Sequence, residues 1–255
     1  MPFSKYDTPE MVEAYRGLLV GLRSVTILPA DTPMTSHWPV VGGNYSGDLL
    51  VVGQAVFGWI PRWDLRDLGE DRGLERVLED TRSPLNERAD PMSWIATNSH
   101  RGSPFWRVVR LISENLASDP EVSWHSRLAW TNLYPVGRQQ PAGNPYSELL
   151  EFQTEPAAAF LAATIAALEP RLVLVLGGPY WWSFAERLGL DSMTVEPKPL
   201  LRSGNGLGAR WVIGWHPAGA QRRGWRVAEY AKQVALAASK PAPAPSSPWQ
   251  ETGIR

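Results

Sequence analysis

Three short polar segments each follow an apolar, strand-like run, and together they carry side chains that can do chemistry. They are Gly53-Gln54-Ala55 after residues 48–52, Thr131-Asn132 after residues 127–130, and His216-Pro217-Ala218 after residues 211–215. Loops that leave the carboxyl ends of parallel strands converge on one crevice, where ligands bind. A glycine loop, an amide and an imidazole that meet there can grip a planar, hydrogen-bonding ligand such as a nucleobase.

The elements that must position these segments alternate between strand and helix patterns. Continuous apolar runs closed by glycine or polar residues predict buried strands near 48–53, 127–132, 170–178 and 210–215. The spacing of apolar residues predicts helices near 9–22, 70–80, 104–117, 148–168, 179–188 and 223–238, with a break or a fresh start at Pro156. This alternation predicts an α/β fold, a three-layer α/β/α sandwich around a mostly parallel four-stranded sheet.

The length of 255 residues suits one large domain and is short for two. We expect a single domain over residues 1–239, with an irregular lead-in at 29–47. Residues about 59–101 are charged and poorly periodic, and we interpret them as an insertion that covers or flanks the crevice. The Pro-, Ala- and Ser-rich residues 240–255 predict a disordered tail.

Composition excludes several classes of site. The chain has no cysteine, so it has no disulfide, no thiolate metal site and no Cys-ligated iron–sulfur cluster. No apolar run approaches the roughly 20 residues that cross a bilayer. The histidines other than His216, which are His37, His100 and His125, show no metal-ligand spacing. We expect a cytoplasmic monomer with no cofactor, no metal and no membrane partner.

Positive charge is concentrated in one segment although the formal net charge is −1. No acid occurs between Glu196 and Glu229. That interval holds Lys198, Arg202, Arg210, Arg222, Arg223 and Arg226. A basic patch on a nearly neutral chain is typical of localised phosphate contact. A solvated loop that lacks acids is the alternative interpretation.

The order and spacing of these segments resemble the uracil-DNA glycosylase superfamily. Its members have Gly-(Gln/Glu/Ile/Leu)-x-Pro after the first strand, Thr-Asn or Leu-Asn at a central strand, a Pro-x-hydrophobic-Leu-Gly strand, and His-Pro-Ser near the C-terminal end. The matching segments here are Gly53-Gln54-Ala55, Thr131-Asn132, residues 170–177 and His216-Pro217-Ala218. The likeness spans about residues 45–238, and it implies the superfamily's fold and DNA as a partner.

Two departures from the pattern bear on the substrate. Ala55 stands where the most studied members have an acid, and Val56 stands where they have proline. The residues that shape a uracil pocket are therefore not all present, so the resemblance does not fix uracil as the base.

The resemblance implies roles for residues around a base that has been flipped out of the DNA stack. His216 would donate a hydrogen bond to the base as negative charge develops on it. Asn132 would read the edge of the base through its amide, although an Asx turn at the strand end is the alternative. Gln54 would position a water, and Gly53 and Ala55 would line the base pocket.

Aromatic and acidic candidates complete the implied pocket. Phe57 or Phe105 would stack on the base, with Trp106 as the next candidate, and core packing is the alternative for all three. Hydrolysis through an oxocarbenium-like sugar needs a carboxylate or an oriented water. Because the first loop holds no acid, Asp64 and Asp67 are the candidate carboxylates, with plain surface charge as the alternative.

The residues behind His216 match in place the loop that members of the superfamily push into the minor groove. Gln221 or Arg222 would fill the gap left by the flipped base, and Arg223 and Arg226 would hold phosphates. The alternative is a basic helix N-terminus, which the helix dipole disfavours.

These inferences predict a DNA glycosylase that removes an unusual or modified base and leaves an abasic site. A modified cytosine of phage DNA and uracil both fit, in bacterial defence or in base-excision repair respectively. A non-catalytic DNA-binding member of the same fold is the alternative, because the first loop lacks an acid. A small-molecule hydrolase is a weaker third option, since the chain has no Gly-x-Ser-x-Gly motif, P-loop or metal-ligand cluster.

Overall fold

A seven-stranded sheet lies at the centre of the computed structural model, which describes residues 6–55, 62–82, 90–96, 102–117, 119–139, 147–190 and 193–240. Its strands, in spatial order, are β2 (Val40–Val41), β5 (Leu128–Tyr134), β3 (Leu49–Ala55), β7 (Leu172–Val175), β10 (Ala209–Gly214), β9 (Leu200–Gly206) and β8 (Thr194–Val195). The four central strands β5-β3-β7-β10 are parallel, and β2, β9 and β8 are antiparallel to their neighbours. The fold is therefore mixed α/β with a parallel centre.

The four parallel strands are those that the sequence predicts, but the prediction of a four-stranded sheet is wrong. Strand β9 extends the sheet through a two-residue hairpin, because Gly206 pairs with Ala209 across Leu207 and Gly208. Both turn residues have positive φ, 50° and 75°. This conformation gives a hairpin the twist of its strands and is why glycine is favoured there. The polar sequence of residues 202–206 hides this strand from a search for apolar runs.

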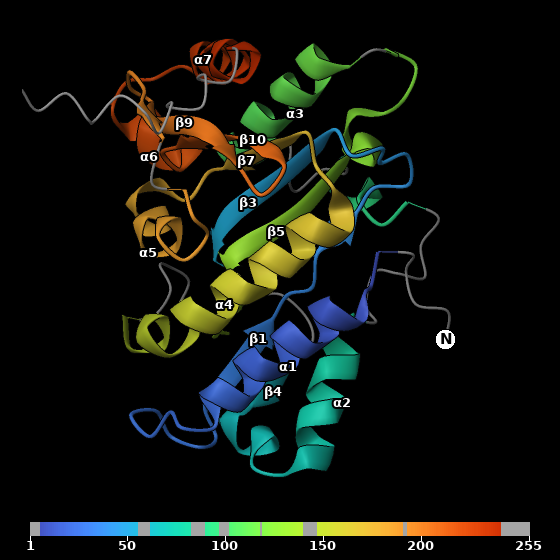
Figure 1. Cartoon of the computed structure of the whole chain (residues 1–255), viewed down its shortest axis with the longest axis vertical. Helices are drawn as coiled ribbons and strands as arrows, with labels where there is room; N and C mark the ends of the chain where they lie inside the picture. Colours follow the sequence, from blue (N-terminus) through green and yellow to red (C-terminus); the bar gives the residue numbers. More distant parts are fainter. Residues whose placement is uncertain are drawn as a thin grey trace, which may run out of the picture.

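Helices cover both faces of the sheet (Figure 1). Helices α1 (Pro9–Leu22) and α4 (Ser147–Leu168) pack together on one face, and α3 (Pro104–Leu116) and α7 (Val227–Ser239) pack together on the other. Alternate residues of β3 contribute to opposite cores, Leu50 and Val52 to the first and Leu49 and Val51 to the second. Burial on both faces explains why the central strands are continuous apolar runs.

A second, three-stranded sheet lies beside α1 and α2 (Asp71–Arg82). Strand β1 (Pro33–Ser36) is its centre, with β4 (Arg62–Asp64) and β6 (Val136–Arg138) antiparallel on either side. The interpretation of residues 29–47 as irregular is therefore wrong, since they contain β1 and β2. The described part of residues 59–101 is also more than a covering insertion, because β4 completes this sheet and α2 packs against α1.

Several helix bounds differ from the predicted ones. Helix α4 continues through Pro156 without a break. The predicted helix at 179–188 is a 3-10 turn, Gly178–Trp181, followed by the short α5 (Trp182–Ala185). The predicted helix at 223–238 starts at Val227, and a separate helix α6 (Pro217–Arg222) precedes it. Gly224 has a φ of +88°, which no helix can continue through.

The predicted tail begins with a residue that has a defined contact. The ammonium of Lys240 lies 2.6 Å from a carboxylate oxygen of Glu196, which follows β8. Residues 241–255 lie outside the described residues.

Candidate functional site

Strand register brings the predicted segments to the same edge of the sheet. Gly53 pairs with Asn132 across β3 and β5. Val175, near the end of β7, pairs with Val52 on one side and with Ile213 of β10 on the other. From β3 the chain passes to β5, which lies on one side of β3, and then to β7, which lies on the other side. The switch in strand order therefore lies between β3 and β7. Ligands bind in open α/β sheets outside the carboxyl ends of strands at such a point.

Gly53 and Asn132 fit each other closely. A Cβ atom on residue 53 would lie 2.4 Å from Oδ1 of Asn132, so only glycine leaves room for this amide. The Asn132 side chain is buried, and its Nδ2 has no hydrogen-bond partner among the described residues. An unsatisfied buried donor costs roughly 1–3 kcal/mol. Such a donor on the carboxyl edge can bind an acceptor of a ligand.

A glycine pair after β7 joins the two halves of this edge. A Cβ atom on Gly177 would lie 2.8 Å from Cδ1 of Leu133 and 3.8 Å from Cα of Gln54. Gly178 has a φ of +61°, and a Cβ there would lie 3.8 Å from the backbone nitrogen of His216. The turn therefore lies against β3 and β5 on one side and against the start of α6 on the other. The sequence signal is Gly-Gly directly after an apolar strand, which the sequence interpretation used only to end that strand.

His216 is the N-cap residue of α6 and stacks on Phe105 at the start of α3. The two ring centroids are 5.9 Å apart and the planes differ by 22°. Burial lowers the pKa of His216 below its ordinary value, and the positive charge of Arg222 lowers it further. A neutral imidazole has one N–H donor and one acceptor. At neutral pH His216 is therefore an uncharged hydrogen-bond donor.

The aromatic candidates belong to one connected cluster. Phe105 contacts Trp106 edge-on with centroids 4.8 Å apart, and Trp106 contacts Trp130 and Trp94 at 5.3 Å and 5.7 Å. Phe105 and Trp106 are both buried, so core packing accounts for most of each ring. Only Phe105 also contacts His216, which leaves it as the aromatic at the edge. Phe57 lies outside the described residues.

Of the acidic candidates, Asp64 ends β4 of the second sheet and Asp67 lies in the 3-10 turn that follows it. Asp64 pairs with Arg66 at 2.6 Å, and its backbone N–H donates to Asp67 at 2.9 Å. Asp67 also pairs with Arg76 at 2.7 Å. These contacts give both carboxylates a local structural role. Among the described residues, no carboxylate forms a hydrogen bond or ion pair with Asn132 or His216.

Gln54 and Ala55 end β3 and are half-buried. The backbone of Gln54 lies against the Gly177 turn, as described above, which places the residue on the carboxyl edge with Gly53. Gln54 is therefore a polar side chain of the first loop that the structure does bring to the edge. Ala55 pairs with Tyr134 across β3 and β5.

The basic residues behind His216 are exposed, and Arg222 lies on a helix where the sequence predicts an inserted loop. Gln221 and Arg222 end α6, Arg223 follows it, and Arg226 is the N-cap residue of α7. Arg222 Nε donates to the Ala218 carbonyl at 3.3 Å, and Arg223 Nη1 donates to the Gly219 carbonyl at 3.0 Å. The argument from the helix dipole is therefore wrong for Arg222 and Arg223, since cations at a helix C-terminus are stabilising.

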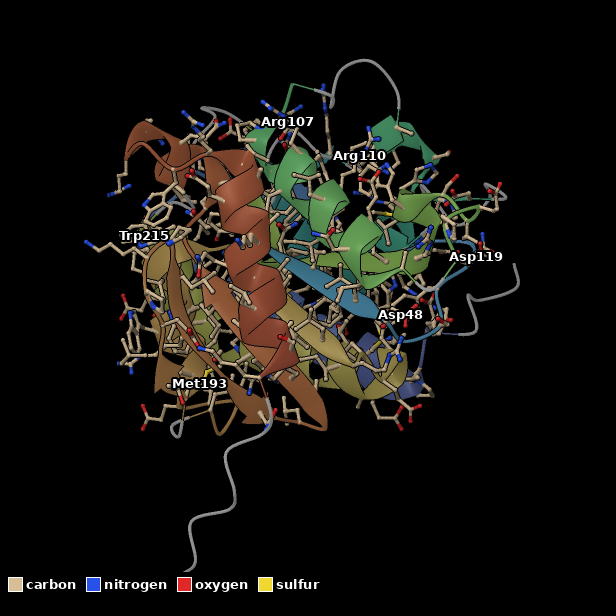
Figure 2. All side chains as sticks on the ribbon, turned by 90° about the horizontal axis from the view of Figure 1, so that it is seen from above. Asp48, Arg107, Arg110, Asp119, Met193 and Trp215 are labelled. Carbon is tan, nitrogen blue, oxygen red and sulfur yellow. The ribbon has the colours of Figure 1, made fainter. Side chains whose placement is uncertain are left out.

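Other cations of the acid-free segment have structural contacts. Arg223 lies 4.3 Å from the Trp215 ring centroid, and Arg202 lies 5.1 Å from the Trp182 centroid. Arg210 donates to the carbonyl of Ala237 at 2.9 Å. Figure 2 shows Trp215 at the side of α7, away from Asp48. The segment is thus not one uniform patch, because several of its cations contact other groups of the protein.

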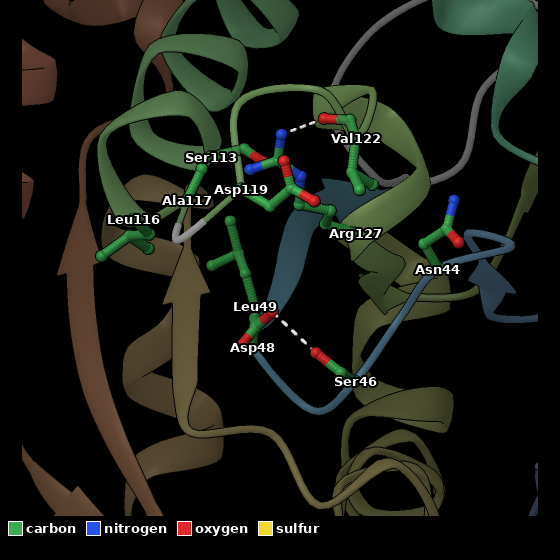
Figure 3. A pocket seen from close by; sticks show the side chains of 10 residues that line it. All are labelled: Asn44, Ser46, Asp48, Leu49, Ser113, Leu116, Ala117, Asp119, Val122 and Arg127. Carbon is green, nitrogen blue, oxygen red and sulfur yellow. Dashed lines mark hydrogen bonds between the residues drawn. The ribbon is translucent and has the colours of Figure 1, made fainter.

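A cavity of about 140 Å³ lies at the opposite end of the same strands. Ser46 donates to Asp48 there at 2.8 Å, and Arg127 donates to the carbonyl of Val122 (Figure 3). Asp48 directly precedes β3, whereas Gly53 lies near the end of that strand. This cavity is therefore separate from the carboxyl edge.

Comparison with known proteins adds no assignment: no family model and no curated protein matches the chain. Within the described ranges, no group of three or more His, Cys, Asp or Glu side chains is placed to hold a metal ion. No helix in those ranges has the length and apolar character of a membrane span. The geometry of the carboxyl edge is thus the basis for a functional assignment.

Proposed function

We propose that this protein is a DNA glycosylase with the fold of the uracil-DNA glycosylase superfamily. It would bind a flipped unusual or modified base at the carboxyl edge of the sheet and hydrolyse its N-glycosidic bond. The observation that carries the proposal is the buried Asn132 amide, whose Nδ2 lacks a partner among the described residues and whose Oδ1 lies against Gly53. This amide presents both a donor and an acceptor to a ligand, as the edge of a nucleobase requires.

His216 supplies the second half of the proposed chemistry. Water adds its oxygen to the sugar carbon C1′, the electron pair of the C1′–N bond leaves with the base, and the proton of the water ends on the departing base. Negative charge develops on the base as that bond breaks. A neutral, preorganised N–H donor in a water-poor site stabilises such charge, and burial together with Arg222 favours the neutral form of His216.

Gln54 is the proposed residue for positioning the water. It is half-buried at the end of β3 and lies beside the Gly177 turn. Asp64 is not retained in this role, because its carboxylate already pairs with Arg66 in the 3-10 turn after β4. An oriented water in place of a carboxylate fits the small Ala55 side chain at the following position.

The test is release of free base from DNA by the full chain. DNA carrying uracil, hypoxanthine, 5-hydroxymethylcytosine or glucosylated hydroxymethylcytosine is incubated under single-turnover conditions. Free base is measured by mass spectrometry, and abasic sites are measured by alkaline strand cleavage. We expect release of at least one base, and loss of the donor in His216→Ala should lower its rate by about 100-fold or more. His216→Gln, which keeps a donor, should retain more activity than His216→Ala.

The alternative function is DNA binding without catalysis. It is supported by the absence of a carboxylate bonded to Asn132 or His216 among the described residues. Binding of DNA without base release across the whole panel would favour it over the glycosylase. Asn132→Ala should then weaken binding to the recognised base without any change in strand cleavage.

A further inference from the structure

A groove of about 740 Å³ runs along the outer side of α3, away from the carboxyl edge. We call it the α3 groove and define it by Trp106, Arg107, Arg110, Trp124 and Ala228. Ala228, in the first turn of α7, closes it on one side, and the turn that begins at Trp124 closes it on the other. Its volume lies in the range of sites that hold small organic ligands, about 300–1,000 Å³.

Two arginines of α3 line the α3 groove, and one of them is already paired. Arg110 pairs with Glu114 at 2.7 Å, and His125 pairs with Asp90 at 2.9 Å. Arg107 is exposed, and no carboxylate in the described ranges forms an ion pair with it. Figure 2 shows Arg107 and Arg110 along the same helix, α3. An exposed guanidinium on the rim of a groove, with the neighbouring acids already paired, is suited to a phosphate.

The walls of the α3 groove are aromatic and apolar. Trp124 is half-buried and Trp106 is buried, and both line the cavity with Leu111 and Val227. A tryptophan face that borders such a space can stack a nucleobase, and stacking tolerates any base because each has a π face. An aromatic wall with one free guanidinium at its rim matches a base joined to a phosphate.

The α3 groove also borders the candidate site through a single turn of helix. Phe105 stacks on His216, and the next residue, Trp106, lines the α3 groove and contacts Phe105. A strand of nucleic acid that leaves the carboxyl edge over the start of α3 therefore reaches the α3 groove directly.

We propose that the α3 groove binds a nucleotide, with its base against Trp124 and its phosphate at Arg107. In a complex with DNA this is a nucleotide that flanks the one held at the carboxyl edge, a part of the proposal that rests on the proposed function. The same chemistry is present in a free mononucleotide, so the experiment has an arm for each source.

The first arm uses a fluorescein-labelled oligonucleotide of ten thymidines, and the second uses free deoxyadenosine monophosphate. Two variants act on the groove in different ways: Ala228→Phe fills it, and Arg107→Ala removes the cation. Their matched controls are Ala159→Phe, at an exposed alanine of α4 on the other face of the sheet, and Arg72→Ala, at an exposed arginine of α2. Circular dichroism and thermal unfolding verify that all four variants are folded.

We expect both groove variants to weaken oligonucleotide binding by about five- to tenfold, as loss of one stacking or charged contact does. Arg107→Ala should also flatten the log-affinity versus log-salt slope by roughly 1, whereas Ala228→Phe should leave that slope unchanged. Both controls should bind as the wild type does. If deoxyadenosine monophosphate binds with the same dependence on the two variants, the groove also accepts a free nucleotide. If the two variants weaken only oligonucleotide binding, the groove binds a nucleotide within a nucleic-acid strand.

Binding of both probes by the groove variants with wild-type affinity would overturn the proposal, as would binding of neither probe by the wild type. Base release is measured separately, so the two proposals fail independently. If the wild type releases a base and Ala228→Phe binds DNA with wild-type affinity, only the groove proposal is overturned. If the wild type releases no base but the groove variants weaken binding, only the glycosylase proposal is overturned.

Discussion

The side-chain oxygen of Asn132 lies 2.4 Å from the position that a Cβ atom of residue 53 would take. The two residues pair across β3 and β5, which places the amide on the carboxyl edge. Glycine at position 53 is thus part of the candidate site even though it has no side chain. Its role is to let a neighbouring strand present a polar group.

We expect Gly53→Ala to displace the Asn132 side chain and to lower base release by at least tenfold. The contact is with an amide that has little space to move, because it is buried. Protein stability should fall as well, by about 1–3 kcal/mol, as overpacking in a core does. The matched control is Gly17→Ala in α1, where an added Cβ meets no atom within 4 Å. That variant should keep full activity, and equal activity in Gly53→Ala would remove the amide from the site.

The pH dependence of base release should reveal the influence of Arg222 on His216. Burial and the positive charge of Arg222 lower the pKa of His216, so the neutral donor persists to a pH below about 6.5. Activity should therefore be constant near neutral pH and fall as the pH drops through this lowered pKa. In Arg222→Ala the acidic limb should move to higher pH, because one of the two causes of the shift is gone.

This shift in His216 can be followed without catalysis. Nuclear magnetic resonance of the imidazole signals gives the pKa of His216 directly in both proteins. Arg226→Ala is the control that removes the same charge from the N-cap of α7. An unchanged His216 titration in Arg222→Ala would mean that burial alone sets its pKa.

The fold was predictable where local sequence decides structure. Helices α1 and α3 start at the proline positions that the pattern indicates, and the four parallel strands are buried on both faces and therefore read as apolar runs. The second sheet was not predictable in this way. Its three strands come from residues 33–36, 62–64 and 136–138, and only their pairing in space makes them strands.

The candidate site, too, was predictable from the sequence only in part. Gly53, Asn132 and His216 follow predicted strands, and strand order alone brings such residues to one edge. The stacking of Phe105 on His216 depends on how α3 packs across the sheet, and the contacts of Gly177 and Gly178 depend on a turn that joins three strands. The ion pair of Asp64 with Arg66 and the pairing of its strand β4 were not predictable, because the sequence does not reveal the second sheet.

Arg226 is expected to contact a DNA phosphate. It is exposed at the N-cap of α7, where its backbone N–H donates to Glu229 at 3.3 Å and its carbonyl accepts from Tyr230 at 3.0 Å. Its side chain forms no hydrogen bond or ion pair with another described residue. Arg226→Ala should weaken DNA binding at every sequence alike and flatten the log-affinity versus log-salt slope by roughly 1. Fluorescence anisotropy at several salt concentrations measures both, with Arg72→Ala as the control. A wild-type slope in Arg226→Ala would place this side chain off the DNA.

The pairing of Glu196 with Lys240 should make the stability of the fold depend on acid pH. Glu196 is buried, and it accepts hydrogen bonds from Lys240 at 2.6 Å and from Ser203 at 2.5 Å. Burial alone would raise the pKa of Glu196, but the hydrogen bonds from Lys240 and Ser203 and the nearby positive charges outweigh it and leave the pKa lowered. A carboxyl group with a lowered folded-state pKa stabilises the fold above its unfolded-state pKa. That stabilisation is lost as the pH falls through the folded-state value.

We therefore expect Lys240→Ala to reduce the free energy of unfolding at pH 7 by roughly 1.5–3 kcal/mol, the usual range for hydrogen bonds to a charged group. The loss should fall at the low end, because half of the Lys240 side chain is exposed to solvent. At an acid pH below the lowered pKa of Glu196, the difference from the wild type should shrink, since protonated Glu196 no longer attracts the ammonium. Urea unfolding at both pH values measures the difference, with Lys232→Ala at an exposed position of α7 as the control. The same loss at both pH values would show that Lys240 stabilises the end of α7 by packing and not by its charge.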